Sequence, residues 1–360
     1  MTTAYKRIVV KIGSNVLTQS NGLPDLARIE HLVDQIITLK KQGIAVVVVS
    51  SGAVAAGKSM ISISEKKHNA VAERQLLASI GQIKLINIYL SLFEKQDLLC
   101  SQVLVTKEDF RDRKHYLNIK NCLTILLKHH VIPIINENDV VSVTELMFTD
   151  NDELAGLVAS MLDADALIIL SNVDGIYNGD PRSPGSSVIE EIRRDNDTVG
   201  SFISTAKSGS GRGGMVTKLG MAQKVARLGI PVHIANGTRN DVLTDLISNK
   251  VIHTYFVPEK NTSGKKKWIA HSEQSATGIV QLNQGAAEAL ISGQARSLLP
   301  VGILEVKSGF QKGDIIRLVD QHDILIGLGI AEYGSDKTKE RIGQKGQKPL
   351  VHYNYFYAVG

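Results

Sequence analysis

Short runs of apolar residues alternate with longer amphipathic stretches along the first 240 residues of the chain. The apolar runs are rich in β-branched residues and cover residues 8–10, 44–49, 103–105, 131–135, 167–170 and 232–234. The amphipathic stretches have helical spacing and cover residues 26–42, 71–95, 116–130, 152–162 and 217–228. Unbroken apolar runs are typical of strands that are buried on both faces. The alternation therefore predicts an α/β domain with a mainly parallel central sheet, whose ligands gather at the carboxyl ends of the strands.

The pattern changes after about residue 240. A polar stretch, PEKNTSGKKK at residues 258–267, reads as a flexible linker. Beyond it come short runs that indicate a small β-rich module, at residues 268–270, 278–281, 302–306, 315–318 and 325–330. We therefore predict a first domain at residues 1–257, a linker at 258–267 and a β-rich domain at 268–360.

The composition narrows the choice of partners. The chain is 43% hydrophobic and 21% charged, with a formal net charge of +5 and a pI of about 9.0. A mildly basic protein suits an anionic ligand such as a nucleotide, but the excess of charge is weak evidence for nucleic acid. Residues 261–360 contain 12 Lys and Arg against 9 Asp and Glu, without a basic stripe interleaved with aromatics. RNA binding is therefore not expected, although it remains the alternative to an enzyme.

The remaining composition indicates a cytoplasmic protein without metal or membrane sites. Cys100 and Cys122 do not make a disulfide framework and are expected to be free thiols. No Cys/His cluster has zinc spacing, so no metal site is expected in the protein itself. The N-terminal segment does not resemble a signal peptide, and the longest apolar run, residues 44–49, is too short to span a bilayer.

One string matches a phosphate-binding motif to the letter. Residues 52–59 read GAVAAGKS, which fits the P-loop pattern GxxxxGK[ST] and follows a predicted strand. However, its small residues also suit the start of a tightly packed helix, and other Gly-rich segments with lysines compete for the phosphates. We interpret the string as structural or substrate-side and do not expect Lys58 to take part in phosphoryl transfer.

Two other strand ends carry candidate phosphate or carboxylate contacts. Lys11 ends the first strand and is followed by Gly13, which would let the backbone approach a phosphate while the lysine supplies charge. Ser51 and Gly52 follow the second strand, where a hydroxyl group and a backbone amide at a helix start suit a carboxylate or a phosphoryl group. A solvated lysine and an ordinary serine cap are the structural alternatives.

Polar clusters follow two further elements. Asn136, Glu137, Asn138 and Asp139 end a buried strand and could hold the ammonium and carboxylate of an amino acid, although a plain turn is the alternative. Asp150 and Asn151 open the next helix, where Asp150 could cap it or lie between two lysines.

The nucleotide has its own candidates. The Gly-rich loop at residues 209–218 (GSGRGGMVTK) runs into a helix, and such a loop can wrap phosphates at the helix N-terminus. Ser171 and Asn172 follow another strand, where a nucleotide base could lie. A flexible linker and a plain turn are the alternatives for these two segments.

Taken in order, these motifs resemble the amino-acid kinase superfamily and, within it, the glutamate 5-kinases. The similar stretches include VVKIGS, VSSGAVAAG, RQLLASIGQ, INENDVV, DNDELA, DGIYNGDPR and GRGGMVTK. The C-terminal part, with KKKWI, GAAEAL and SLLPVGI, resembles a PUA module. The resemblance implies a three-layer sandwich of the amino-acid kinase type followed by a small β-rich PUA-like domain.

The resemblance also implies roles for individual residues. Lys11 and Lys218 would be catalytic, with Asp150 organising them, and glutamate would contact Ser51, Gly52, Asp139 and Asn151. ATP would contact a larger set: Lys11, Gly13, Ser171, Asn172, Arg212, Gly213, Gly214, Met215, Val216, Thr217 and Lys218. Asn172 and Arg212 depart from the usual pattern of the family.

The activity implied is ATP- and Mg²⁺-dependent phosphorylation of the side-chain carboxylate of L-glutamate, the first step of proline biosynthesis. The resemblance further implies a homo-oligomer, dimer or tetramer, and a functional partnership with glutamyl-phosphate reductase. Another acidic acceptor, such as aspartate or N-acetylglutamate, is the alternative within the same fold.

Overall fold

The chain forms two compact units. The structure, a computed structural model, describes residues 5–61, 69–141, 151–194, 214–292 and 297–359. The first unit ends at Asn261 and the second begins at Thr262. This division falls inside the stretch 258–267 that the sequence suggested as a linker, but residues 264–267 of that stretch are helical. Each unit is described by itself below.

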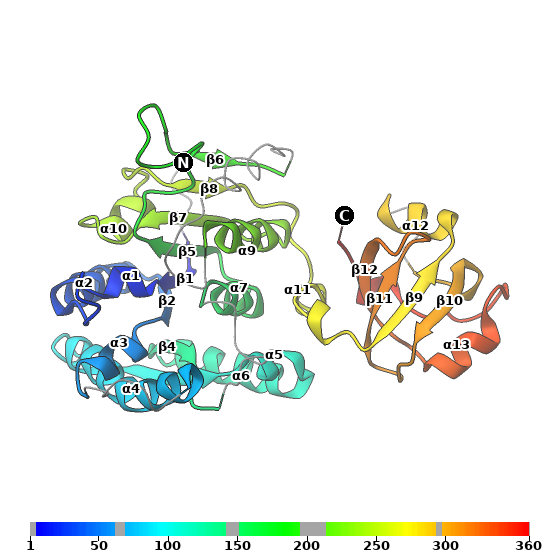
Figure 1. Cartoon of the computed structure of the whole chain (residues 1–360), viewed down its shortest axis with the longest axis horizontal. Helices are drawn as coiled ribbons and strands as arrows, with labels where there is room; N and C mark the ends of the chain where they lie inside the picture. Colours follow the sequence, from blue (N-terminus) through cyan, green and yellow to red (C-terminus); the bar gives the residue numbers. More distant parts are fainter. Residues whose placement is uncertain (1–4, 62–68, 142–150, 195–213, 293–296, 360) are drawn as a thin grey trace. The chain divides into compact units, whose positions relative to one another are not determined.

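The first unit is built on an eight-stranded sheet in the order β3-β4-β2-β1-β5-β7-β8-β6 (Figure 1). The strands are β1 (Arg7–Ile12), β2 (Ala45–Ser50), β3 (Cys100–Val105), β4 (Ile132–Glu137), β5 (Ala166–Ser171), β6 (Glu191–Ile192), β7 (Val232–Asn236) and β8 (Thr254–Phe256). The six apolar runs of the sequence form six neighbouring strands of this sheet, which are β3, β4, β2, β1, β5 and β7. These six strands are parallel, so the prediction of a mainly parallel sheet is confirmed. Strand β8 runs antiparallel to β7 and was not predicted, because its three residues are too few to show a pattern.

Helices cover both faces of this sheet, as expected (Figure 1). One face carries α2 (Leu26–Lys41), α4 (Ala70–Glu94) and α10 (Val242–Ile247), and the other carries α6 (Arg113–Lys128), α7 (Asn151–Leu162) and α9 (Met215–Arg227). Short helices follow three strands: α1 (Ser14–Leu17) after β1, α3 (Ala53–Lys58) after β2 and α5 (Lys107–Arg111) after β3. The five long amphipathic stretches were therefore predicted correctly, and the short helices were missed.

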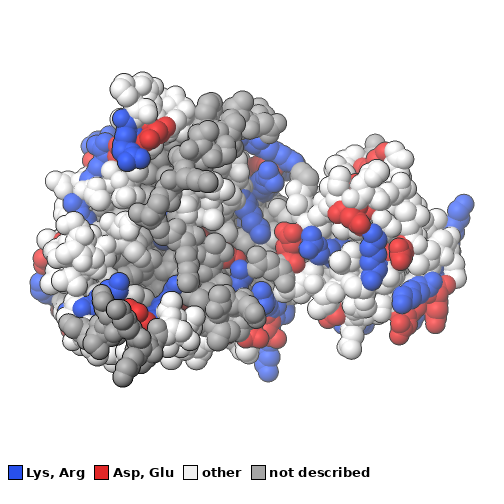
Figure 2. Space-filling model, in the orientation of Figure 1, with Lys and Arg blue, Asp and Glu red and all other residues white. Residues whose placement is uncertain are grey.

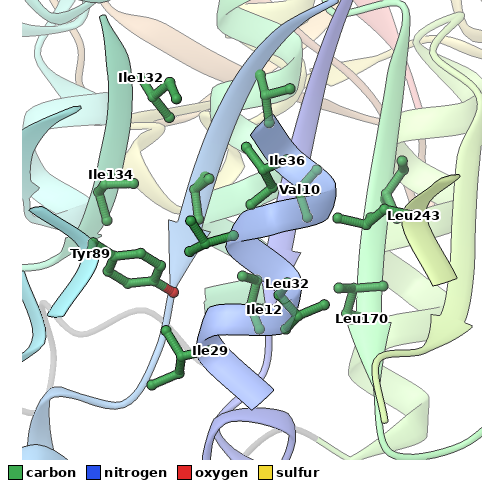
Figure 3. Close-up of a cluster of buried hydrophobic side chains, with 14 of the residues drawn as sticks. Val10, Ile12, Ile29, Leu32, Ile36, Tyr89, Ile132, Ile134, Leu170 and Leu243 are labelled. Carbon is green, nitrogen blue, oxygen red and sulfur yellow. The ribbon is translucent and has the colours of Figure 1, made fainter. Parts of the chain in front are cut away.

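The core shows how β1 divides its side chains between the two faces. Ile8, Val10 and Ile12 belong to the apolar cluster that includes Leu32 and Ile36 of α2 (Figure 3). Successive side chains of a strand point to opposite faces, so Lys11 points toward the face that carries α7. The strand that anchors the core thereby also delivers a buried lysine to the carboxyl end of the sheet.

Helix α4 is unusual in length and composition. Among the helices that the structure describes, it is the one long and apolar enough to cross a membrane by those two criteria alone. It packs against α2, α3 and β3 of the first unit. Its outer face leaves Leu76 and Ile83 exposed, at 37% and 64%.

The second unit is a five-stranded sheet in the order β10-β9-β11-β12-β13. Its elements are α11 (Gly264–Ala270), β9 (Gly278–Leu282), α12 (Gln284–Ile291), β10 (Ile303–Ser308), β11 (Ile315–Val319), β12 (Leu325–Ile330), α13 (Ser335–Arg341) and β13 (Phe356–Ala358). Four of the five predicted strands are present. On the face shown in Figure 2, acidic and basic side chains of this unit are interspersed.

The prediction of a strand at residues 268–270 is wrong. Trp268 and Ile269 are buried in the last turn of α11. Three apolar residues in a row fit a short strand and the buried end of a helix equally well. The lysines before them favour the helix, since lysine is a good helix former.

Candidate active site

Polar side chains gather where the central parallel strands end. Strands β1, β2, β4 and β5 lie next to one another, and because they are parallel their carboxyl ends meet at one edge of the sheet. These ends carry Lys11, Ser51, Asn136 and Ser171. The sheet thus brings together residues that are far apart in the sequence.

Two lysines share one buried carboxylate at this edge. Lys11 Nζ lies 2.6 Å from Asp152 Oδ1, and Lys218 Nζ lies 2.9 Å from Asp152 Oδ2. The Asp152 side chain is fully buried, while those of Lys11 and Lys218 are 6% and 14% exposed. Burial alone would raise the pKa of Asp152, but the two ammonium groups outweigh it and hold that pKa below its usual value. The centre therefore holds two positive charges against one negative charge.

Packing between α7 and α9 explains why Asp152 and Lys218 meet. Both residues lie in the first turn of their helices. About one turn further along, Gly156 of α7 faces Met221 of α9 so closely that a Cβ atom at Gly156 would lie 2.4 Å from the Met221 sulfur. The glycine lets the two helices approach, and their N-termini bring the two side chains together.

The residue between the lysines was missed by the sequence reasoning. Asp150 was expected to organise them, and it lies outside the described residues. Asp152 is two positions further on, inside the helix rather than at its cap. A sequence with two acidic residues at a helix start does not reveal which one faces the lysines, because that depends on where the helix begins.

Gly13 lies close to the ammonium group of Lys11. A Cβ atom there would lie 3.4 Å from Lys11 Nζ and 3.2 Å from the carbonyl oxygen of Leu170. Helix α9 begins after Gly214, and Lys218 belongs to its first turn. A helix N-terminus and a nearby ammonium pair fit a polyphosphate. Of the other predicted ATP contacts at this loop, Met215, Val216 and Thr217 open α9, while Arg212 and Gly213 lie outside the described residues.

An amide cluster joins the ends of β2 and β4 to the start of α7. The Asn151 side-chain amide lies within 3.0 Å of both the Ser51 hydroxyl oxygen and Asn136 Oδ1, and 3.1 Å from the Ser50 carbonyl oxygen. Asn136 in turn donates to Gln82 Oε1 at 3.0 Å. Ser51 and Asn151 were predicted to contact the substrate, and the structure brings them together. Asn136 was mentioned only as part of a polar cluster, and Gln82 was not singled out.

Gly52 holds the backbone beside this cluster in a conformation that favours glycine. Its φ is 105°, in the left-handed region, and it caps the N-terminus of α3. The residue was predicted as a substrate contact, and its backbone conformation supplies a structural reason for glycine at the same position.

Two buried carboxylates lie at the end of β4 and just after it. Glu137 and Asp139 are 4% and 8% exposed. Both carboxylates lie close to the guanidinium group of Arg74, which is near the start of α4. Asp139 was a predicted substrate contact, whereas Arg74 was not identified. Arg74 opens the stretch RQLLASIGQ that carries part of the family resemblance, but the stretch does not reveal its partners, which come from the end of a distant strand.

Ser171 and Asn172 end β5 on the other side of Lys11. Ser171 is buried and Asn172 is exposed. Close by along the chain, Asp174 accepts a hydrogen bond from Arg239 Nη2 at 2.8 Å. The bonds from Arg239 hold the pKa of Asp174 below its usual value. Sequence reasoning did not identify this ion pair.

The P-loop-like string serves helix packing. A Cβ atom at Gly57 would lie 2.0 Å from the carbonyl oxygen of Leu77, and one at Gly81 of α4 would lie 1.8 Å from that of Ala53. Both glycines are therefore required where α3 and α4 cross. Lys58 ends the six-residue helix α3 and is exposed. The interpretation of residues 52–59 as the start of a tightly packed helix is confirmed.

The chain is similar to known proteins over its whole length. Residues 6–236 match the Amino acid kinase family, and residues 278–353 match the PUA domain. It is 50% identical to a "Glutamate 5-kinase" from Bacteroides thetaiotaomicron, over 99% of this chain and 99% of that protein. It is 49% identical to a "Glutamate 5-kinase" from Chlorobaculum tepidum, over 99% of this chain and 98% of that protein.

A solved structure shares the fold of the first unit. The carbamate kinase from Giardia lamblia bound to AMP-PNP is 19% identical to this chain. The match covers 71% of this chain and 99% of that one, with a TM-score of 0.51. At this level of identity the likeness concerns the fold alone.

Proposed function

The chain belongs to the glutamate 5-kinases of the Amino acid kinase family, and on that premise we propose how its own residues carry out the ATP-dependent phosphorylation of glutamate. The observation that carries the proposal is the Lys11–Asp152–Lys218 centre at the carboxyl edge of the sheet. It is a preorganised pair of cations next to a cluster of amide and hydroxyl groups.

The chemistry demands charge stabilisation more than proton transfer. The side-chain carboxylate of glutamate is already ionised near pH 7, so it needs no general base to attack the γ-phosphorus. The difficulty is to bring one anion to another and to stabilise the charge that spreads over the transferred phosphoryl oxygens. Fixed cations in a site that excludes water are well suited to both tasks.

Lys11 and Lys218 supply these cations in the proposed mechanism. Asp152 holds each ammonium group through a separate carboxylate oxygen, so both lysines are oriented before the substrates arrive. The role that the sequence suggested for Asp150 is therefore assigned to Asp152. The phosphoryl group would pass in line from ATP to glutamate beside the two ammonium groups.

The ATP phosphates are proposed to lie between Gly13 and the start of α9. Gly13 carries no side chain in front of Lys11, and Gly214 precedes the 13-residue helix α9, whose first turn includes Lys218. Ser171 and Asn172 would face the rest of the nucleotide. A Mg²⁺ ion held by the phosphate oxygens would neutralise part of their charge.

Glutamate is proposed to bind on the opposite side of Lys11. Ser51 and Asn151 would contact its reacting carboxylate, with Gly52 offering a backbone amide. The Asp139 carboxylate would accept a hydrogen bond from the α-ammonium group, since a buried carboxylate is a suitable partner for a cation.

The wider biological setting follows from the product. An acyl phosphate hydrolyses readily, so a reductase that consumes it at once is the functional partner we propose, in the cytoplasm. A homo-oligomer, dimer or tetramer, remains part of the proposal. No observation favours RNA as a partner of the second unit, whose charges are interspersed on the face in view (Figure 2).

The experiment that tests the function is an ATP-dependent hydroxamate assay across a panel of acidic acceptors. Purified protein is supplied in turn with L-glutamate, L-aspartate and N-acetylglutamate, and trapped acyl phosphate is measured as hydroxamate. Glutamate should be the preferred acceptor. Preference for another acceptor would assign the same chemistry to a different substrate, and activity with none would refute the proposal.

A further inference from the structure

Arg74 joins the first turn of α4 to the segment that follows β4. Its Nε and Nη2 atoms donate to Asp139 Oδ1 at 2.9 and 2.6 Å, and Nη2 lies 3.5 Å from Glu137 Oε2. The arginine side chain is 32% exposed, whereas both carboxylates are nearly inaccessible to solvent. Neither the sequence motifs nor the proposed mechanism gives Arg74 a role.

The way in which Arg74 contacts Asp139 leaves one carboxylate oxygen available. Guanidinium groups often bind a carboxylate side by side, with one N–H on each oxygen. Here both N–H groups go to Oδ1, and Oδ2 accepts no hydrogen bond from the described part of the chain. A carboxylate can accept several hydrogen bonds, so the nearly buried Asp139 would favourably bind a further donor that arrives with the substrate.

The local charge favours a cation as that donor. Among the ion pairs of the described residues, the carboxylates of Glu137 and Asp139 both face the single guanidinium group of Arg74. This acidic pair directly follows Asn136, whose side chain accepts from Asn151 in the amide cluster of the substrate site. The α-ammonium group is the single cationic group of glutamate, and Asp139 follows Asn136 by three residues along the chain.

We propose that Arg74 is a positioning residue for recognition of the amino group. It holds Asp139 through Oδ1 and so presents Oδ2 to the α-ammonium group of the acceptor. The inference rests on the proposed function, in which Asp139 contacts glutamate. It predicts an effect on acceptor binding and none on the transfer step, because Arg74 touches neither the lysines nor Asp152 in the described structure.

Gln75, the next residue, offers a matched control. Its side-chain amide donates to the carbonyl oxygen of Val140 at 2.9 Å, so it ties α4 to the same segment without touching a carboxylate. If Arg74 acted only by holding the segment in place, loss of the Gln75 contact would have a similar effect. If Arg74 acts through Asp139, only the arginine matters.

The test compares four variants in steady-state kinetics: Arg74→Met, Gln75→Ala, Asp139→Ala and the double variant Arg74→Met/Asp139→Ala. Loss of a charge-assisted hydrogen bond should raise the KM for glutamate by about 10- to 100-fold in Arg74→Met. The kcat and the KM for ATP should stay within about twofold, the pattern of lost ground-state binding. Gln75→Ala should change the KM for glutamate by less than about threefold.

The double variant shows whether Arg74 acts through Asp139. Once Asp139 is absent, removing Arg74 should raise the KM by no more than about twofold further. Additive losses would overturn the inference, because they would mean that Arg74 binds the substrate independently. A Gln75→Ala effect as large as that of Arg74→Met would also overturn it.

Glutarate, which lacks the α-ammonium group, provides a second readout. The preference of the wild-type protein for glutamate over glutarate should shrink in Arg74→Met by about the same factor as the rise in KM. An unchanged preference would overturn the inference. Should Arg74→Met fail to fold, Arg74→Lys keeps the charge without the planar fork and should raise the KM for glutamate several-fold; an unaltered KM there would count against the inference.

These outcomes separate the inference from the function on which it rests. A raised KM in Asp139→Ala with a normal KM in Arg74→Met would refute the role of Arg74 alone. A normal KM in Asp139→Ala would refute the assignment of Asp139 and the inference with it. Absence of activity with glutamate in the wild-type protein would refute the proposed function itself.

Discussion

Two regions of the first unit each combine glycines with lysine near a helix start, and they differ in what surrounds those residues. In residues 52–59 the space that Gly57 leaves is filled by the backbone of α4, and Lys58 lies exposed. At the second region a Cβ atom at Gly13 would lie 3.2 Å from the nearest backbone atom, the Leu170 carbonyl oxygen, and Lys11 is buried against Asp152. The sequence of the first region matches a phosphate-binding motif. The second region has the buried lysine and the paired charge that phosphoryl transfer needs.

The contrast teaches that a glycine-rich motif has to be read together with its neighbours. A glycine can serve a ligand only if no other backbone occupies the space it leaves. A lysine can stabilise a transition state only if it is held in place and shielded from water. The experiments below on Asp152, Gly57 and the pair Lys11 and Lys58 each test one side of this comparison.

The largest effect on stability is expected from Asp152→Asn. This change leaves two buried ammonium groups without their common counter-ion, which costs about 3–5 kcal/mol of the free energy of unfolding. Urea unfolding followed by circular dichroism measures the loss. The matched control is Glu30→Gln, which removes the exposed pair with Lys95 and should cost less than about 1 kcal/mol. Equal losses in the two variants would contradict the special character of the buried centre.

The packing role of the P-loop-like string is tested by Gly57→Ala. The new methyl group would meet the Leu77 backbone, so the variant should lose about 1–3 kcal/mol or more of stability. Its turnover per folded molecule should stay close to that of the wild-type protein. Gly220→Ala in α9 is the control, since a Cβ atom there meets nothing within 4 Å and alanine favours a helix by up to about 1 kcal/mol. A loss of turnover without loss of stability in Gly57→Ala would restore the phosphate-binding interpretation.

A third test uses a buried group that has no counter-ion in the described structure. Burial lowers the pKa of His233 to about 3, with a further contribution from His253, and Tyr5 is hydrogen-bonded to its Nε2 atom. Between pH 6.5 and about 3 the unfolded chain binds a proton at this site and the folded chain does not. Stability should therefore fall as the pH falls through this window, by up to about 1.4 kcal/mol per pH unit.

His233→Phe should flatten that slope. The contribution of Asp152, whose pKa is also lowered, is present above its ordinary value of 3.8 and is lost only at lower pH. The two groups are thus distinguished by the range of pH in which each acts. An unchanged slope between pH 6.5 and 4 in His233→Phe would contradict the assignment.

Much of the fold could be predicted from the pattern of the chain. Parallel strands buried on both faces leave long apolar runs, and the helices between them leave a helical period. The antiparallel strand β8 and the short helix α11 escaped because three to seven residues do not establish a period.

The site was predicted in part for a related reason. Lys11 and Asn151 lie at the ends of regular elements and Ser51 directly follows one, so their position at the carboxyl edge could be inferred. Asp152 and Arg74 could not, because their roles depend on which face of a helix meets a partner from a distant segment. Which side chain faces a partner depends on where the helix begins and on how it packs. Neither two nearby acidic residues nor a single arginine reveals this in the sequence.

The most direct measurement is the kcat of Lys11→Met and Lys58→Met, purified side by side and assayed with saturating glutamate and ATP. Loss of a cation that stabilises the transition state should lower the kcat of Lys11→Met by about 100-fold or more. Lys58→Met should stay within about twofold of the wild-type protein, because Lys58 is exposed at the end of α3. A collapse of turnover in Lys58→Met, with turnover retained in Lys11→Met, would contradict the account and place the phosphates at residues 52–59.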